Sequence, residues 1–411
     1  MATQLDIILP IAVASPDESR LQLCPRRAYE FVGTCPSPTT DLFSTDVFLR
    51  LSQEDESIRA ALVLIGDVYV INSQQPAQSQ QGDVLMETEQ NELYATIQTR
   101  TQKPDAHTDP SLFLLTLLFC ITRLMSNRST NVCLQILDQV AFYIVHPRGP
   151  DRLSTQFDKS TLLVFRFLQG VGKLMRDECT TFANAEWCKT YQDVKVGGVP
   201  INREQDTWFF ECVCIFVARL ADINVQRFTR VPEFVHDAMD CTCSDCAEAS
   251  TYFKHLATGQ NIMRQAVELL ESIDRFDEML SGSKLAHDSA YDMFHAHSLC
   301  LRIGTLRLFS HFLWQKAPFS EEALRESGIQ AYAQTSLNHV GNRLQYCGLE
   351  AVIHIQHLVV IGIEVRDLAS RHLVTSLLQK IRSQGFIIAE VYIADLQLAW
   401  EAVTGASGPA T

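Results

Sequence analysis

The sequence lacks an apolar run long enough to cross a membrane. The apolar segment Leu112 to Thr122 is stopped by Arg123, well short of the roughly 20 residues that a membrane-spanning helix needs. The apolar stretch Ile7–Ser15 is not a signal peptide by its pattern, because Asp6 precedes it and Pro10 interrupts it. We therefore expect an intracellular protein, in the nucleus or the cytoplasm, that does not bind a membrane.

Positive charge is also scarce. The chain has 34 Lys and Arg against 48 Asp and Glu, a net charge of −14. Nucleic-acid binding requires a basic face that neutralises phosphates, and the short basic groups Arg26–Arg27 and Arg227–Arg230 are too isolated to form one. We expect no direct nucleic-acid binding by this chain alone.

The motifs that carry common enzyme chemistry are missing as well. There is no glycine-rich phosphate loop, no nucleophile elbow and no redox Cys-x-x-Cys in a βαβ context, so no cofactor is expected. Asp274–Glu278 is similar to the Asp-rich magnesium motif of class I terpene cyclases, but the second motif of those enzymes is absent. A charged helix face explains this segment better.

Helical periodicity dominates what is present, whereas the alternation typical of strands is nearly absent. With 46% hydrophobic residues, the chain can bury a large core. The sequence predicts an all-α, multi-helix superhelical or bundle domain over 41–402. Its predicted helices cover 110–126, 130–146, 158–176, 204–226, 248–281, 287–315, 319–341, 346–363, 366–384 and 386–402.

Proline, glycine and polar residues mark the remaining segments. We expect residues 1–40 to be extended, because prolines recur along them, and 403–411 to form a disordered tail. A mobile Gln/Ser-rich loop is expected over 72–82 and a long loop over 183–203. Ser52 is the expected cap of the first convincing helix.

Cysteine is frequent, with 13 residues, several of them in apolar contexts such as those of Cys120 and Cys133, and the odd number favours buried free thiols in a reducing compartment. One cluster could bind zinc, although a single unrepeated run is a weak candidate. It consists of Cys241, Cys243, Cys246 and His236. His354 and His357 lie in the apolar segment 351–359, which contains no carboxylate, and are expected to be core histidines with hydrogen-bond partners.

Aromatic residues gather in several segments. Such stripes are usually core, but if a ligand pocket exists, they are the residues expected around it: Trp187, Trp208, Phe209, Tyr291, Phe294 and Trp314. Its expected polar groups, which would be the catalytic residues of an enzyme, are Glu211, Asp292 and His311.

Three segments together are similar to a known family. The first segment runs from Arg27 through residues 46–51 to Gly66. The second is a pair of apolar helices that begin near Leu112 and Asn131. The third, near the C-terminus, contains Gly362–Asp367, Arg371, Gly385 and Trp400. In pattern and order they resemble the regulatory (middle-homology) domain of fungal zinc-cluster transcription factors. The chain departs from that family because Cys24 and Cys35 stand alone where six paired cysteines would form the zinc cluster.

The resemblance implies a fungal regulatory protein that influences transcription indirectly, in connection with secondary metabolism. It would act through a partner regulator or a small hydrophobic metabolite, and a homodimer is compatible with this role. The alternative is a helical scaffold that serves as a cofactor-free cyclase, pericyclase or isomerase on an apolar natural-product intermediate. A third interpretation places a zinc cluster upstream of Met1.

Overall fold

Two helices, α5 (Leu112–Met125) and α15 (Ala351–Glu364), have buried residues around most of their circumference and lie deep in the protein. A helix without a polar face is stable only where other helices surround it. The remaining helices supply that cover, and one contiguous hydrophobic core runs from Ile58 in the N-terminal part to Leu396 near the C-terminus.

The computed structural model describes residues 45–73, 79–109, 111–126, 130–149, 156–196, 205–238, 249–309, 326–345, 347 and 350–405. Over these residues every regular element is a helix and no strand occurs, which confirms the predicted all-α class. None of the helices in these ranges is long and apolar enough to cross a membrane.

The N-terminal half consists of α2 (Thr45–Glu54), α3 (Glu56–Ser73), α4 (Ser79–Thr101), α5, α6 (Thr130–Val140), a π-helix (Ala141–Val145), α7 (His146–Arg148), α8 (Gln156–Met175) and α9 (Lys189–Val196). Short 3₁₀ turns occur at Ala106–Thr108 and Thr181–Ala183. The second half consists of α10 (Gln205–Ala238), α11 (Ala249–Ser281), a 3₁₀ turn (Lys284–His287), α12 (Ser289–Leu308), α14 (Glu326–Arg343), α15, α16 (Leu368–Ser383) and α17 (Ile388–Gly405).

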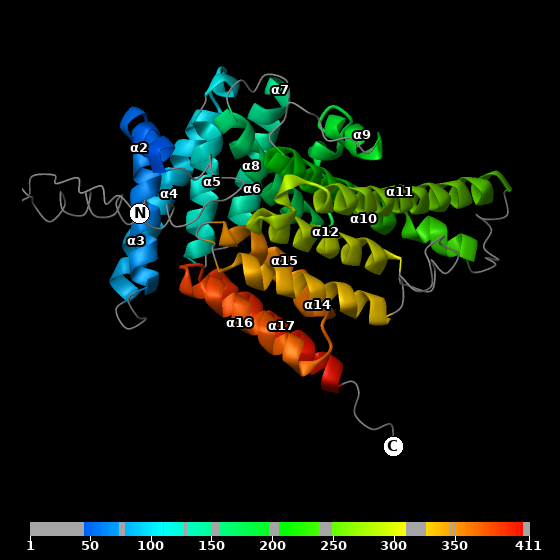
Figure 1. Ribbon diagram of the computed structural model, residues 1–411. Coiled ribbons are helices and arrows are strands. Elements are labelled where there is room, and N and C mark those ends of the chain that lie inside the picture. The colour runs from blue at the N-terminus through cyan, green and yellow to red at the C-terminus, as the bar shows by residue number, and fades with distance from the viewer. Residues whose placement is uncertain are drawn as a thin grey trace, which may run out of the picture.

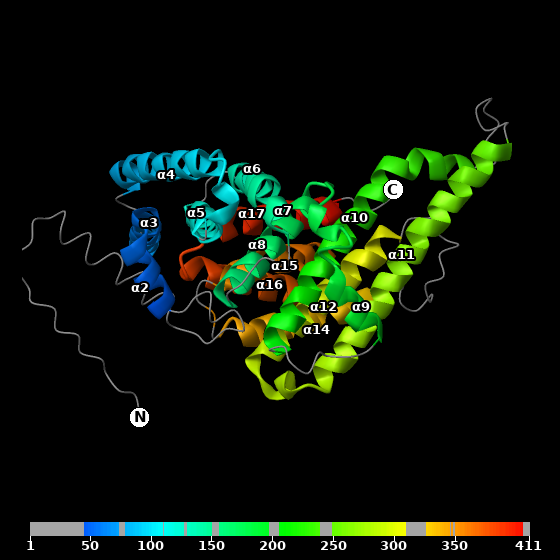
Figure 2. The same cartoon turned by 90° about the horizontal axis from the view of Figure 1, so that it is seen from above.

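These helices form an elongated bundle (Figure 1). The group α2–α4 lies at one edge, and α10 and α11, the longest helices, pack against each other and reach the opposite edge. Figure 2 shows the same arrangement from above, with α5–α8 between the two edges. The antiparallel pair α16–α17 packs against α15, so α15 is enclosed by the last two helices and by α12 and α14.

Three local expectations differ from the structure. Ser52 lies inside α2, and the first turn of α3 is capped instead by Asp55, whose carboxylate accepts a hydrogen bond from the Ser57 amide at 2.9 Å. The expected loop over 72–82 is shorter, because α3 extends to Ser73 and α4 begins at Ser79. Within the expected loop over 183–203 the helix α9 packs against α10 and α11.

Other expectations lie outside the described residues. These are the extended segment 1–40 and most of the tail over 403–411, of which α17 takes the part up to Gly405.

Candidate functional site

A pocket of about 260 Å³ lies between α5, α6, α8, α15 and α17. Most of its wall is aliphatic or aromatic: Leu124, Leu134, Leu137, Phe167, Leu168, Val171, Met175, Val352 and Ile355. The polar lining consists of Asn131, Arg176, Gln356 and Tyr392, together with the thiols of Cys120 and Cys133. An apolar pocket with a few converging polar groups is the usual form of a small-molecule site.

The amide of Gln356 and the hydroxyl of Tyr392 form the polar centre of this wall. Gln356 Nε2 donates to the Tyr392 hydroxyl at 2.9 Å, while Gln356 Oε1 is buried and has no hydrogen-bond partner among the described residues. Exchanging the amide oxygen and nitrogen would again leave one of them unpaired. A buried unpaired amide atom is costly, so a ligand that hydrogen-bonds to it gains free energy.

Two ionisable groups of the wall, the Tyr392 phenol and the Cys120 thiol, are held in their neutral forms. Burial raises the pKa of Tyr392, although the hydrogen bond from Gln356 opposes this shift. Burial likewise raises the pKa of the Cys120 thiol, and its neighbour Cys133 adds to this effect. The two thiols point to each other's backbone, at 3.8 and 3.9 Å from the respective carbonyl oxygens. Because the thiolate is the nucleophilic form, Cys120 is unreactive here.

Beyond Phe167 the pocket wall meets a second buried group, the imidazoles of His297, His354 and His357. The Phe167 ring contacts His297 edge to face at 5.2 Å between centroids. The His297 ring lies 5.7 Å from that of His354 and 5.0 Å from that of His357. Burial lowers the pKa of all three, that of His297 to about 4, so the rings are neutral at pH 7.

Two of these histidines have hydrogen-bond partners and one does not. His297 Nδ1 pairs with the Met293 carbonyl at 2.7 Å, and His357 Nε2 pairs with Ser336 Oγ at 2.7 Å. Neither ring nitrogen of His354 has a partner among the described residues. The expectation that these core histidines have hydrogen-bond partners is therefore confirmed for His357, whereas His354 has none among the described residues.

A fully buried ion pair, Arg343 with Glu350, lies at the start of α15, next to these histidines. Arg343 at the end of α14 donates to both carboxylate oxygens of Glu350, at 2.7 and 2.8 Å, and the two side chains are 0% and 3% exposed. Such a bidentate geometry compensates for much of the cost of removing both charges from water. The pair fixes the entry into α15, which carries Gln356 and two of the histidines.

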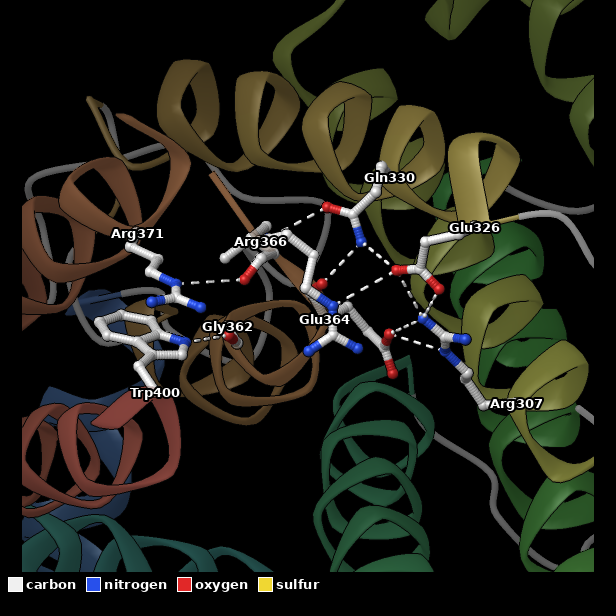
Figure 3. A network of polar contacts seen from close by, with 9 residues as sticks. Arg307, Glu326, Gln330, Gly362, Glu364, Arg366, Arg371 and Trp400 are labelled. Atoms are coloured by element: carbon white, nitrogen blue, oxygen red, sulfur yellow. Dashed lines mark hydrogen bonds and ion pairs between the residues drawn. The ribbon is translucent and has the colours of Figure 1, made fainter. Parts of the chain in front are cut away.

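The other end of α15 is held by a polar network (Figure 3). Glu364 accepts from Arg307 Nε of α12 at 2.7 Å, and Gln330 of α14 donates to the Glu364 carbonyl at 2.7 Å. On the opposite side the Trp400 indole donates to the Gly362 carbonyl at 2.8 Å, with the Arg371 guanidinium 5.4 Å above its ring. Both ends of the helix that bears the polar groups are therefore anchored.

Most of the predicted aromatic residues are packed in the core and do not line this pocket. Trp187, Trp208, Phe209 and Phe294 are at most 2% exposed. Phe209 contacts Trp208 at 5.0 Å and Phe294 at 5.8 Å between ring centroids, and Trp187 packs on Phe182 at 5.2 Å.

The three remaining described candidates are engaged in separate contacts. Tyr291 stacks on His295 with 5.4 Å between ring centroids, and Asp292 pairs with His339 Nδ1 at 2.6 Å. Glu211 lies 3.9 Å from the buried guanidinium of Arg166. Two other candidates, His311 and Trp314, lie outside the described residues.

The two metal-like motifs of the sequence have different outcomes. The zinc candidate Cys241, Cys243 and Cys246 lies outside the described residues, as does the side chain of His236. In the Asp-rich segment, Arg302 lies 2.6 Å from Asp274 and 3.3 Å from Asp277, so both carboxylates are ion-paired within the protein.

The polar residues of the pocket are not found from the sequence, because no local pattern marks them. Gln356 follows an apolar turn, and Tyr392 lies 36 residues further along the chain. A usable signal exists for Gln356, since it is an uncharged polar residue within one of the most apolar helices of the chain.

Comparison of the chain with known protein families, with curated proteins and with solved structures finds no match in any of the three.

Proposed function

We propose that the protein is a small-molecule-binding regulator whose ligand occupies the pocket between α5, α6, α8, α15 and α17. The observation that carries this proposal is an apolar pocket of about 260 Å³ with one buried amide atom, Gln356 Oε1, that has no hydrogen-bond partner within the described part of the chain. The ligand is a small, mainly apolar molecule with one hydroxyl or N–H group that donates to Gln356. Its apolar part would displace water from leucine, valine and phenylalanine surfaces.

Binding is favoured over catalysis by the chemistry of the wall. Its phenol and the Cys120 thiol are protonated at pH 7, since burial raises the pKa of each. Its cation, Arg176, is engaged by Asp138 and Glu178 at 3.1 and 3.2 Å. General acid–base catalysis works best with groups whose pKa lies near the operating pH, and these residues do not provide one.

The wider role follows from the resemblance to the regulatory domain of fungal zinc-cluster transcription factors. We propose that ligand binding alters how the chain contacts a partner regulator and thereby influences transcription indirectly, in secondary metabolism. The net charge of −14 supports contact with a protein partner rather than with DNA.

Displacement of an apolar fluorescent probe, N-phenyl-1-naphthylamine, tests the pocket. Gly172→Ala is the informative variant, because the new Cβ would lie 2.0 Å from Leu134 Cδ2 and push this side chain toward the pocket that it lines. We expect probe affinity to fall several-fold. Gly341→Ala is the matched control, since its Cβ would meet only Leu377 at 3.8 Å.

A second variant tests the polar contact. Gln356→Leu keeps the size of the side chain and removes the amide, so it should lose affinity for hydroxylated apolar metabolites and retain affinity for their analogues that lack the hydroxyl. Equal probe binding by the wild type, Gly172→Ala and Gly341→Ala would show that the probe does not occupy this pocket, and the proposal would be abandoned.

A further inference from the structure

Three potential metal ligands meet at the start of α15. One ligand atom from each of Cys347, Glu350 and His354 lies within 4.8 Å of the other two. All three residues are buried, with exposed fractions of 6%, 3% and 0%. The spacing Cys-x₂-Glu-x₃-His brings them together from one short stretch of chain, so the cluster does not depend on distant parts of the fold.

His354 is the residue that points to a ligand. A neutral imidazole has one N–H donor and one lone-pair acceptor, and in His354 both are buried without a hydrogen-bond partner among the described residues. Native proteins rarely leave such groups unpaired, and a bound ion is one way in which they are satisfied. Burial and the neighbouring His297 and Arg343 lower the pKa of His354, which keeps its lone pair free at neutral pH.

We propose that Cys347, Glu350 and His354 bind one divalent transition-metal ion of the zinc class. A thiolate, a carboxylate and an imidazole are ligands that Zn²⁺ takes, whereas Mg²⁺ and Ca²⁺ prefer oxygen ligands alone. This site is separate from the pocket and does not depend on the proposed function.

The charges around the cluster are compatible with a divalent ion. The Cys347 thiol donates to the Arg343 carbonyl at 3.3 Å and lies 3.8 Å from Glu350 Oε1. The metal replaces the thiol proton, which is released to solvent, and with the Arg343 guanidinium included the ion, the thiolate and the carboxylate carry a net charge of +1. Arg343 can keep its two hydrogen bonds, because each carboxylate oxygen has a second lone pair.

A tetrahedral site needs a fourth ligand. His297 offers one, because its Nε2 is buried and unpaired among the described residues and its ring centroid lies 5.7 Å from that of His354.

Metal loading of the full-length protein tests the proposal. The purified chain is loaded with Zn²⁺, desalted and assayed by mass spectrometry for bound zinc; a second sample is loaded with Co²⁺ for absorption spectroscopy. Cys347→Ser and His354→Gln should each lose one equivalent of metal. The Co²⁺ form of the wild type should show a thiolate charge-transfer band and the visible bands of a tetrahedral ion.

The matched control is the triple variant Cys241→Ser, Cys243→Ser and Cys246→Ser, which removes the Cys-x-Cys-x₂-Cys run at 241–246. It should keep both the zinc equivalent and the cobalt spectrum. The proposal is overturned if the wild type retains no metal, or if the triple variant loses the metal while Cys347→Ser keeps it. Should Cys347→Ser fail to fold, His354→Gln decides the question, because it should lose the zinc equivalent that the triple variant keeps.

Discussion

At the residue scale, Gly362 marks the closest approach of α15 and α17. A Cβ at this position would lie 2.7 and 2.9 Å from the two terminal carbons of Leu396 and 3.2 Å from Val374. The Gly362 carbonyl also accepts the Trp400 indole hydrogen bond. Glycine is therefore favoured here by the packing of the helices and not by backbone conformation, because an added Cβ would force the Leu396 side chain to move.

Gly362→Ala should destabilise the protein by about 1–3 kcal/mol through overpacking, even though alanine favours helices by about 1 kcal/mol over glycine. Urea unfolding followed by circular dichroism measures the change. Gly341→Ala, with its nearest contact at 3.8 Å, should be neutral or slightly stabilising. Equal effects of the two substitutions would contradict the assigned contact with Leu396.

Arg343 is a second residue whose replacement should strongly lower the stability of the folded protein. Replacing it by Met leaves the Glu350 carboxylate buried without its bidentate partner, and we expect a loss of about 3–5 kcal/mol in the free energy of unfolding. The double variant Arg343→Met, Glu350→Gln removes both charges and should recover part of this loss. A single variant as stable as the wild type would show that the pair is open to solvent.

The pocket shows where sequence reasoning reaches its limit at this scale. Large aromatic side chains such as Trp208 and Phe209 are plausible ligand contacts by their chemistry, but they gain more free energy by filling the core. The pair Gln356–Tyr392 depends on the docking of α17 against α15, which no local pattern encodes.

At the scale of the elements, α17 is attached to α15 by few polar contacts, and the Trp400 indole is one of them. Trp400→Phe keeps an aromatic ring under Arg371 and removes the 2.8 Å hydrogen bond to Gly362. We expect a loss of about 1 kcal/mol, together with faster amide hydrogen exchange in α17 and unchanged exchange in α5. Uniformly faster exchange along the chain would argue against a local role.

Helices α12 and α15 carry the buried histidines, and this makes stability depend on pH. The pKa of His297 is lowered from 6.5 to about 4 in the folded state, so the unfolded chain takes up a proton first as the pH falls. Stability is therefore complete above pH 6.5 and is lost progressively down to about pH 4. At about 1.4 kcal/mol per pKa unit, His297 accounts for roughly 3 kcal/mol, and His354 and His357 act in the same direction.

Urea unfolding at a series of pH values between 4 and 7 measures this dependence, because this range spans the folded and unfolded pKa values of His297. His297→Gln should reduce the slope, whereas the exposed His372, replaced by Gln, should leave it unchanged. An identical slope in all three proteins would exclude His297 as its origin.

The elements themselves are largely predictable. Strong apolar periodicity locates α5, α8, α16 and α17 to within a few residues. The predicted boundaries are wrong where the amino-acid composition favours a loop but the chain forms a helix. The Gln/Ser-rich residues Ser79–Gly82 are the first turn of α4, because a long helix follows them. Helix α9 forms because it can pack on α10 and α11. Packing against neighbours overrides local propensity at such places.

At the scale of the whole molecule, charge is the most general property. With a net charge of −14, the chain should not bind duplex DNA in fluorescence anisotropy at moderate salt concentration, whatever the sequence. The same titration with a basic DNA-binding protein serves as the control. Tight, sequence-specific binding would contradict the indirect regulatory role.

The pocket takes its walls from two regions that are distant in the chain, residues 120–176 on one side and 352–392 on the other. A molecule bound in the proposed pocket would contact both regions at once and, through Tyr392, would strengthen the docking of α17 on the rest of the bundle. Susceptibility of α17 to protease would then report directly on occupancy, and a partner that recognises the released helix would read ligand concentration without touching the ligand.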